Sequence, residues 1–137
     1  MIKINSEEET RALGLLIAND IEAGDVIALL GDLGTGKTAL TGYIAEGLGV
    51  KENVSSPTFT IVKEYKSGRL PLYHYDVYRL SNGDELLDTG AEDYLSGEGV
   101  CIIEWADIVA DVLPEESVII KIEYGEKEDE RIVTIEQ

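Results

Sequence analysis

The sequence predicts a single α/β domain of three layers, residues 1–137, in which helices cover a central, mainly parallel sheet with added antiparallel strands. Apolar runs alternate with segments of helical periodicity in the first part of the chain. Val100 to Glu104 is apolar until its last residue, which is typical of a strand buried on both faces. Ser117 to Tyr124 and Arg131 to Ile135 alternate between apolar and polar residues, as antiparallel strands with one exposed face do.

The N-terminal region predicts a short strand followed by a capped helix. Ile2 to Ile4 form the strand, and Ser6 and Glu9 have the spacing of a capping box. Gly24 is the stop signal for the helix. Its apolar face consists of residues at helical spacing, namely Leu13, Leu16, Ile17 and Ile21.

The middle of the chain predicts a hairpin and several short helices. Thr58 to Tyr65 and Leu72 to Val77 are β-rich, and the turn residues 67–69 join them. Beyond them we expect short helices around residues 85–87, 91–95 and 105–112. In such a domain we expect the ligand to lie at the carboxyl ends of the parallel strands.

A glycine-rich loop, residues 31–38, joins the predicted strand Asp25 to Leu30 to a helix that runs to about Leu48. Its glycines let backbone N–H groups surround an anion, and the N-terminus of the helix adds donors and a positive dipole end. Lys37 supplies a positive charge for the β- and γ-phosphates, and Thr38 supplies a hydroxyl ligand for Mg²⁺. This context predicts a P-loop NTPase-like domain that binds a nucleoside triphosphate. The alternative is a glycine-rich turn that only caps a helix.

Glu104 is the candidate for the second carboxylate that hydrolysis requires near Mg²⁺. It ends the apolar strand from Val100, a position that brings an acid to the mouth of the glycine-rich loop. An acid after four apolar residues is also common without any function, so both interpretations stay open.

The segment from His74 to Arg79 is the densest group of other functional side chains. On a strand, His74, Asp76 and Tyr78 share one face, so His74 and Asp76 could share a hydrogen bond and orient a water or a metal-bound ligand. Asp76 could coordinate Mg²⁺ or activate water, and Arg79 could neutralise phosphate charge. The alternative is a strand with a polar face, in which His74, the lone histidine, is structural.

Two further segments allow a functional and a structural interpretation. Ser55 to Phe59 offers hydroxyls beside a proline and is either a switch that senses the γ-phosphate or a packed loop. Trp105 either stacks on a base or a mobile loop, or packs in the core.

The net charge of −17, from 28 acidic and 11 basic residues, argues against independent binding of DNA or RNA. The acidic surface is either a solvated face or, in part, a docking face for a basic protein partner. The chain has no signal-peptide pattern at its start and no apolar run near the roughly 18 residues of a membrane helix. Its only cysteine, Cys101, lies in an apolar stretch and reads as a buried thiol. We therefore expect a cytoplasmic protein without a membrane partner.

Four motifs together resemble the bacterial TsaE family of ATPases, formerly YjeE, which act in tRNA threonylcarbamoyladenosine (t6A) biosynthesis. They are the glycine-rich loop, Ser56 to Phe59, His74 to Arg79, and Glu104 with Trp105. The motifs occur in the family order, and the resemblance covers nearly the whole chain. Composition and periodicity do not indicate tRNA modification; only the resemblance does.

The resemblance implies an ATPase that uses ATP and Mg²⁺ and acts with a threonylcarbamoyl transferase subunit and its partner, a TsaD–TsaB type complex. We expect slow hydrolysis without that partner, because positive charges near the phosphates are few, and no direct contact with nucleic acid, because the acidic surface repels it. The implied catalytic residues are Lys37, Asp76 and Glu104, and the implied metal ligands are Thr38 and Glu104. The implied nucleotide-binding residues are Thr10, Leu33, Gly34, Thr35, Gly36, Lys37 and Thr38.

The chain departs from the family pattern at three positions. Ala39 and Gly42 stand where many relatives carry a hydroxyl and an arginine, which removes one basic contact expected from that helix. Ala106 stands where proline is frequent, which affects the turn after Trp105.

Two other functions remain possible on sequence grounds. A small phosphotransferase of the kinase type would need a lid and commonly several arginines, whereas this chain has only Arg11, Arg69, Arg79 and Arg131 and no spare segment for a lid. A nucleotide-dependent scaffold that does not hydrolyse ATP would not need Asp76 or Glu104.

Overall fold

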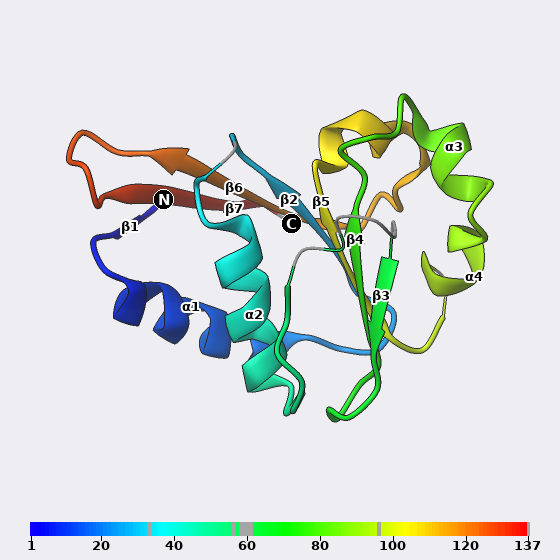
Figure 1. The fold of residues 1–137 in the computed structure, drawn as a ribbon, viewed down its shortest axis with the longest axis horizontal. Helices are drawn as coiled ribbons and strands as arrows, with labels where there is room; N and C mark the ends of the chain where they lie inside the picture. The colour runs from blue at the N-terminus through cyan, green and yellow to red at the C-terminus, as the bar shows by residue number, and fades with distance from the viewer. Residues whose placement is uncertain (33, 56, 58–61, 96, 137) are drawn as a thin grey trace.

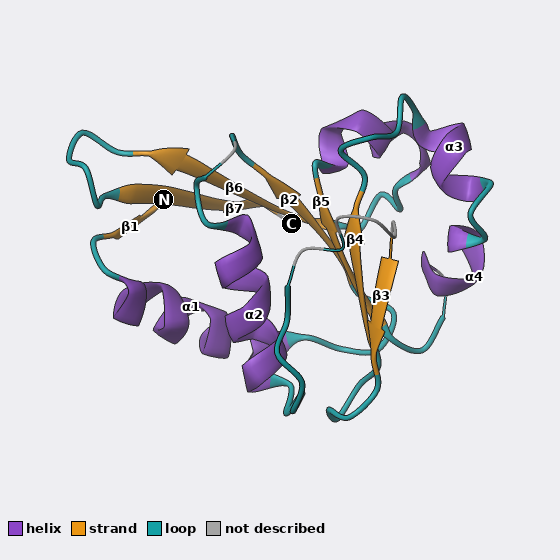
Figure 2. Cartoon of the chain, in the orientation of Figure 1, coloured by secondary structure: helices purple, strands orange, loops and turns teal. Residues whose placement is uncertain are grey.

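The computed structural model describes residues 1–32, 34–55, 57, 62–95 and 97–136. In this part of the chain, seven strands form one mixed sheet in the order β1-β7-β6-β2-β5-β4-β3 (Figures 1 and 2). The strands are β1 (Ile2–Ile4), β2 (Val26–Leu30), β3 (Val62–Tyr65), β4 (Leu72–Asp76), β5 (Val100–Glu104), β6 (Val118–Tyr124) and β7 (Arg131–Glu136).

The centre of the sheet is parallel and both edges are antiparallel. β6, β2, β5 and β4 pair in parallel, whereas β3 at one edge and β7 with β1 at the other pair antiparallel. The predicted α/β class, a parallel core with added antiparallel strands, is confirmed. Because the parallel strands end at one edge, the residues that follow β2, β4 and β5 are brought close together.

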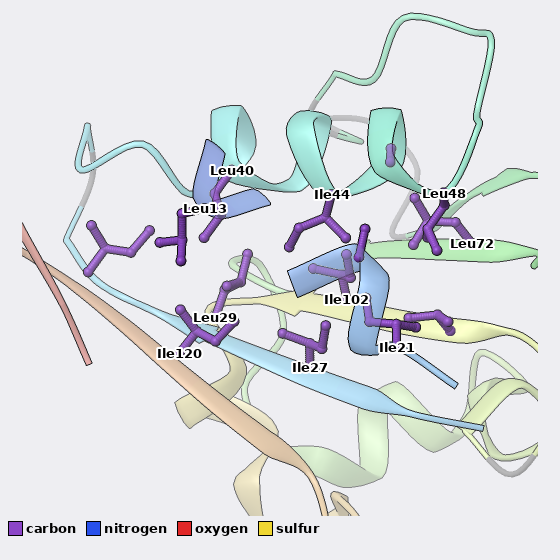
Figure 3. Close-up of a cluster of buried hydrophobic side chains, with 14 of the residues drawn as sticks. Leu13, Ile21, Ile27, Leu29, Leu40, Ile44, Leu48, Leu72, Ile102 and Ile120 are labelled. Atoms are coloured by element: carbon purple, nitrogen blue, oxygen red, sulfur yellow. The ribbon is translucent and has the colours of Figure 1, made fainter. Parts of the chain in front are cut away.

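Helices cover the two faces of the sheet as separate layers. α1 (Glu7–Asp20) and α2 (Lys37–Gly47) lie on one face, and α3 (Gly83–Leu87), α4 (Ala91–Leu95) and the 3₁₀ helix η1 (Ala106–Val112) pack on the other (Figure 1). The first layer buries an apolar cluster that we call the α1–α2 core (Figure 3). It includes Leu13, Ile21, Leu40, Ile44 and Leu48 from α1, α2 and the residues directly after them, and Ile27, Leu29, Leu72, Ile102 and Ile120 from the strands.

Small residues let α1 and α2 approach closely. A Cβ added to Gly14 of α1 would lie 2.5 Å from Cβ of Tyr43 and 3.0 Å from its backbone carbon. A Cβ added to Gly47 of α2 would lie 2.5 Å from Cβ of Ala18. The close contact between the helices therefore depends on glycine, which has no side chain, at these two positions. Helical periodicity alone does not reveal this requirement.

Most predicted elements occur within one or two residues of their expected bounds. Ser6 caps α1 as predicted, since its hydroxyl accepts a hydrogen bond from the N–H of Glu9 at 3.2 Å. The predicted strand Thr58 to Tyr65 is described only from Val62 onward. The last predicted helix, η1, consists of two short 3₁₀ pieces that meet at a kink at Val109. It begins at Ala106, since Trp105 has a non-helical φ of 62°. In the described residues, no helix is long and apolar enough to cross a bilayer.

Candidate functional site

The glycine-rich loop lies at the edge of the sheet where β4 and β5 also end, in the turn between β2 and α2 (Figure 1). Asp76 ends β4 and is the register partner of Glu104, which ends β5. β5 in turn pairs with β2, which leads into the loop. The topology therefore brings three segments that are distant in sequence to one place.

Two glycines give the loop a backbone that other residues rarely adopt. Gly34 has a φ of 82° and Gly36, the N-cap of α2, has a φ of 104°. No side chain caps the helix at Gly36, so the N-terminus of α2 faces the loop without a competing acceptor from the N-cap. Thr35 is buried and stabilises the loop from within, because its hydroxyl donates to the Asp32 carbonyl at 2.9 Å.

Lys37 is held inside the site. It is only 5% exposed, and its Nζ donates to the Gly31 carbonyl at 2.5 Å. The same Nζ lies 3.6 Å from the centroid of the Trp105 ring, a cation–π contact. Burial lowers the pKa of the Lys37 ammonium, and the nearby carboxylates of Glu104 and Asp76 oppose this shift without cancelling it.

Glu104 is the centre of the buried polar contacts. Thr38 Oγ1 lies 3.2 Å from both carboxylate oxygens of Glu104 and donates to them. On the other side, His74 Nε2 lies 2.5 Å from Glu104 Oε2. His74 is fully buried and Glu104 is 3% exposed. We call Lys37, Thr38, His74 and Glu104 the polar cluster.

The partner of His74 differs from the one considered from the sequence. The period of two residues suggested a hydrogen bond between His74 and Asp76, but the structure pairs the imidazole with Glu104. Residues 74 and 76 do share a face, but they stand two positions apart along one strand, whereas Glu104 reaches the imidazole from the neighbouring strand. Asp76 Oδ1 accepts a hydrogen bond from the Tyr78 N–H at 3.0 Å.

Trp105 contacts Lys37 of the polar cluster. It also packs against the second apolar layer, the buried side chains between the sheet and α3, α4 and η1. Its ring lies 5.0 Å from the ring of Tyr78, which is 64% exposed, and Lys37 lies under it. Among the described residues, Trp105 is the only one other than glycine with a positive φ. A strained backbone conformation that is retained next to a cluster of buried polar groups is typical of functional sites.

Two cavities open on either side of the glycine-rich loop. One, of about 330 Å³, is lined by Gly34, Gly36, Lys37, Thr38, Ala39, Asp76, Glu104 and Trp105. The other, of about 440 Å³, shares Gly34, Gly36 and Ala39 and is lined further by Thr35, Leu40 and residues of β1, α1, β6 and β7, including Thr10 and Arg131. The structure therefore gathers Gly34, Gly36, Lys37, Thr38, Asp76 and Glu104 in one cavity and places Thr10 and Thr35 in the other.

Some predicted residues lie elsewhere. Leu33, Ser56, Thr58 and Phe59 are outside the described residues. Arg79 is exposed and does not line either of these cavities. Sequence reasoning missed the contribution of the β6–β7 hairpin, where Arg131 stacks on Tyr124 at 4.6 Å and lines the larger cavity with Asp129. No local motif marks these residues, because only the antiparallel pairing of β7 with β1 brings them to the loop.

Comparison with known proteins gives one consistent family. The model of the family described as threonylcarbamoyl adenosine biosynthesis protein TsaE matches residues 4–133. A Bacillus subtilis protein named tRNA threonylcarbamoyladenosine biosynthesis protein TsaE is 50% identical over 127 residues, which cover 93% of this chain and 78% of that protein. The protein of the same name from Treponema pallidum is 44% identical over 117 residues, which cover 85% of this chain and 86% of that protein.

A solved structure agrees with the sequence comparisons. The crystal structure of Bacillus subtilis YdiB matches with a TM-score of 0.84 and 43% sequence identity, over 98% of this chain and 82% of that chain. The family match, the two relatives and the solved structure each cover most of this chain. The chain belongs to the TsaE family of threonylcarbamoyl adenosine biosynthesis proteins.

Proposed function

We propose that this TsaE family protein binds ATP with Mg²⁺ and hydrolyses it to support the threonylcarbamoyladenosine modification of tRNA. The single observation that carries the proposal is the convergence of Lys37, Thr38, Asp76 and Glu104 on one cavity beside a glycine-rich helix N-terminus. Backbone N–H groups, an ammonium and a hydroxyl next to a carboxylate are the groups that hold a triphosphate and its metal ion.

The donor set fits Mg²⁺ that is held jointly by protein and phosphates. The described residues contain no group of three or more His, Cys, Asp or Glu side chains that could hold a metal ion by themselves. Mg²⁺ usually takes one or two carboxylates plus phosphate oxygens, and Thr38 with Glu104 provides a hydroxyl and a carboxylate already in contact. When bound, Mg²⁺ would neutralise charge on the β- and γ-phosphates.

Lys37 and Thr38 would change partner when the nucleotide binds. Lys37 would exchange the Gly31 carbonyl for phosphate oxygens, and Thr38 would turn its hydroxyl lone pairs to the metal. Asp76, which lines the same cavity next to Glu104, would orient the attacking water and accept its proton. The larger cavity beside Thr10 would receive the base and the sugar, since it opens on the other side of the loop.

The proposed partners are proteins. A net charge of −17 repels tRNA, so the protein would act on a threonylcarbamoyl transferase subunit and its partner, a TsaD–TsaB type complex, in the cytoplasm. Positive charges near the cavity are few, and Lys37 is the only basic side chain among the described residues that line it. Hydrolysis would therefore be slow until the partner completes the site.

Hydrolysis assays with and without the purified transferase complex test the proposal. We expect the complex to raise the rate and Asp76→Asn to lower it with little change in nucleotide affinity, because Asp76 is proposed to act on water. Asp88→Asn is the matched control, since it removes the same charge from an exposed residue at the end of α3. Equal rates for Asp76→Asn and the control, or transfer of phosphate to a metabolite instead of release, would contradict the proposal.

The fluorescence of Trp105 tests binding separately, because it is the only tryptophan in the chain. The Lys37 ammonium lies over its ring, so withdrawal of Lys37 to the phosphates should change its emission. We expect a saturable change with ATP and Mg²⁺. The absence of any change, together with the absence of binding heat at millimolar ATP, would rule out nucleotide binding.

A further inference from the structure

We propose that His74 is a positioning residue for Glu104: its imidazole donates a hydrogen bond from Nε2 that holds the carboxylate against Thr38 and in place for the metal ion. The inference rests on the proposed function, because it concerns the residue that would contact Mg²⁺. It assigns a task to the only histidine of the chain, which the proposed reaction does not otherwise use.

The topology places His74 directly beneath Glu104. His74 pairs with Ile102, and two residues farther along each strand Asp76 pairs with Glu104, so residues 74 and 104 point to the same face of the sheet. This is the face covered by α2, whose first residues are Lys37 and Thr38. The 2.5 Å contact between His74 Nε2 and Glu104 Oε2 therefore lies inside the protein, away from solvent.

The buried surroundings of the imidazole determine where its proton lies. An ionised Glu104 has no proton to donate, so Nε2 must donate to it. His74 Nδ1 is buried and has no hydrogen-bond partner among the described residues. In the other tautomer Nδ1 would be a buried N–H without an acceptor, and Nε2 would have no proton to donate to Glu104. The contact with Glu104 therefore requires a proton on Nε2.

The contact matters most when Thr38 leaves Glu104. In the structure, the carboxylate is held from one side by the Thr38 hydroxyl and from the other by His74. When the hydroxyl turns to a metal ion, the side-chain contact that remains among these is the one from His74. Carboxylates at metal sites are commonly oriented by such a hydrogen bond, and loss of the partner lowers metal affinity about 10- to 100-fold.

The first test detects the tautomer without any nucleotide. Because the chain has one histidine, ¹⁵N-histidine labelling gives the imidazole signals of His74 alone. We expect a protonated Nε2, with a slowly exchanging Nε2–H. An unprotonated Nε2, or averaging of the two tautomers, would overturn the inference.

The second test measures metal binding. Mn²⁺ binding to the ATP complex, followed by electron paramagnetic resonance, should weaken about 10- to 100-fold in His74→Leu. His74→Gln should restore part of the affinity, because its amide can donate from a position close to that of Nε2. ATP binding in EDTA should stay unchanged in both variants. A purely structural role of His74 would lower both affinities together and would not be rescued by glutamine.

Tyr75→Phe is the matched control. Tyr75 is the next residue of β4, is equally buried and points to the opposite face, and its hydroxyl has no hydrogen-bond partner among the described residues. Equal Mn²⁺ affinities in Tyr75→Phe and both His74 variants would overturn the inference about His74 but not the proposed function. Failure of the wild type to bind Mn²⁺ and ATP would overturn the proposed function, and the inference with it. If His74→Leu does not fold, His74→Gln and the tautomer measurement still decide the question.

Discussion

Helix α2 belongs to two regions that are stabilised in different ways. Its apolar face, with Leu40 and Ile44 fully buried, packs into the α1–α2 core, where the contacts are non-directional (Figure 3). Its first residues, Lys37 and Thr38, belong to the polar cluster, where directional hydrogen bonds pair the buried side chains. The two regions are adjacent along one helix, yet a substitution should act on each of them differently.

This difference separates the residues that the folded state needs for its stability from the residues that ligand binding would need. A smaller side chain in the core loses its transfer free energy and leaves a cavity. In the polar cluster, burial of charge is itself unfavourable and is offset by hydrogen bonds, so the cluster contributes little net stability. We interpret Lys37 and Thr38 of the polar cluster as binding groups that are paired within the protein until a ligand replaces those contacts.

Lys37→Ala should separate the two regions most strongly. We expect ATP affinity to fall by about 2–5 kcal/mol, because a buried charged partner of the phosphates is lost. We expect the free energy of unfolding without nucleotide to change by only about 1 kcal/mol, because the lost cation–π contact and hydrogen bond are offset by relief from burying an ammonium. Calorimetry and urea denaturation measure the two quantities.

Lys51→Ala is the control for Lys37→Ala, since it removes the same charge from an exposed position after α2. It should leave both quantities unchanged. If Lys37→Ala destabilises the protein as much as a core truncation does, the distinction between the two regions is wrong.

Ile44→Ala should give the opposite result. Ile44 is fully buried on α2 and in the α1–α2 core, so truncation should lower the free energy of unfolding by about 2–5 kcal/mol. Ile44→Val should cost only about 0.5–1.5 kcal/mol. Urea denaturation gives both values, and nucleotide affinity should be retained at temperatures where the variants remain folded. A loss of affinity in the folded Ile44→Ala protein would mean that the core and the site are coupled.

Local patterns predicted the elements well because each has its own signal. The capping residue Ser6, the helical spacing of α1 and the apolar run of β5 are visible in a few consecutive residues. The order of strands in the sheet has no such local signal, and neither does the close contact of Gly14 with Tyr43. These depend on which side chains meet across the fold.

The candidate site follows the same rule: residues in contiguous motifs could be proposed from the sequence, whereas contacts made only in the fold could not. The glycine-rich loop is contiguous, so its residues could be proposed from the sequence. Glu104 was proposed from its place at the end of an apolar strand, Asp76 from the alternation of its segment, and the family resemblance supported both. The partner of His74 could not be assigned, because β4 and β5 are neighbours only in the folded sheet. Arg131 was missed for the same reason, since it reaches the larger cavity through the pairing of the last strand with the first.

Glycine-to-alanine variants in α1 and α2 test the contact between these two helices, with smaller expected changes in stability than Ile44→Ala. Gly14→Ala forces a Cβ against the backbone of Tyr43, so we expect a destabilisation of about 1–3 kcal/mol. Gly42→Ala is the control within α2, because nothing lies within 4 Å of its added Cβ. Helix propensity should make that variant more stable by up to about 1 kcal/mol. Thermal melts should therefore move in opposite directions, and equal shifts would mean that the close approach of α1 and α2 is not limiting.

The reactivity of Cys101 is the last and smallest of the expected effects, and it reports on the second apolar layer. It lies on the same strand as Glu104, but burial in the layer under α3, α4 and η1 raises the pKa of its thiol to about 12 from a usual value of 9.0. The thiol should therefore resist a disulfide reagent at pH 8 in the folded protein. The thiol ionises at a lower pH in the unfolded chain than in the folded protein. The stability that Cys101 contributes is therefore complete below pH 9.0 and is lost as the pH rises toward 12.

The rate at which Cys101 is labelled then compares the two regions in one experiment. If labelling requires unfolding, Ile44→Ala should accelerate it about 30-fold or more, as expected for a loss of at least about 2 kcal/mol. Lys37→Ala should accelerate it only a few-fold, because the polar cluster contributes little net stability. Rapid labelling of the wild type at pH 8 would show that the second layer opens without global unfolding, and equal acceleration by both variants would show that the polar cluster stabilises the fold as strongly as the core.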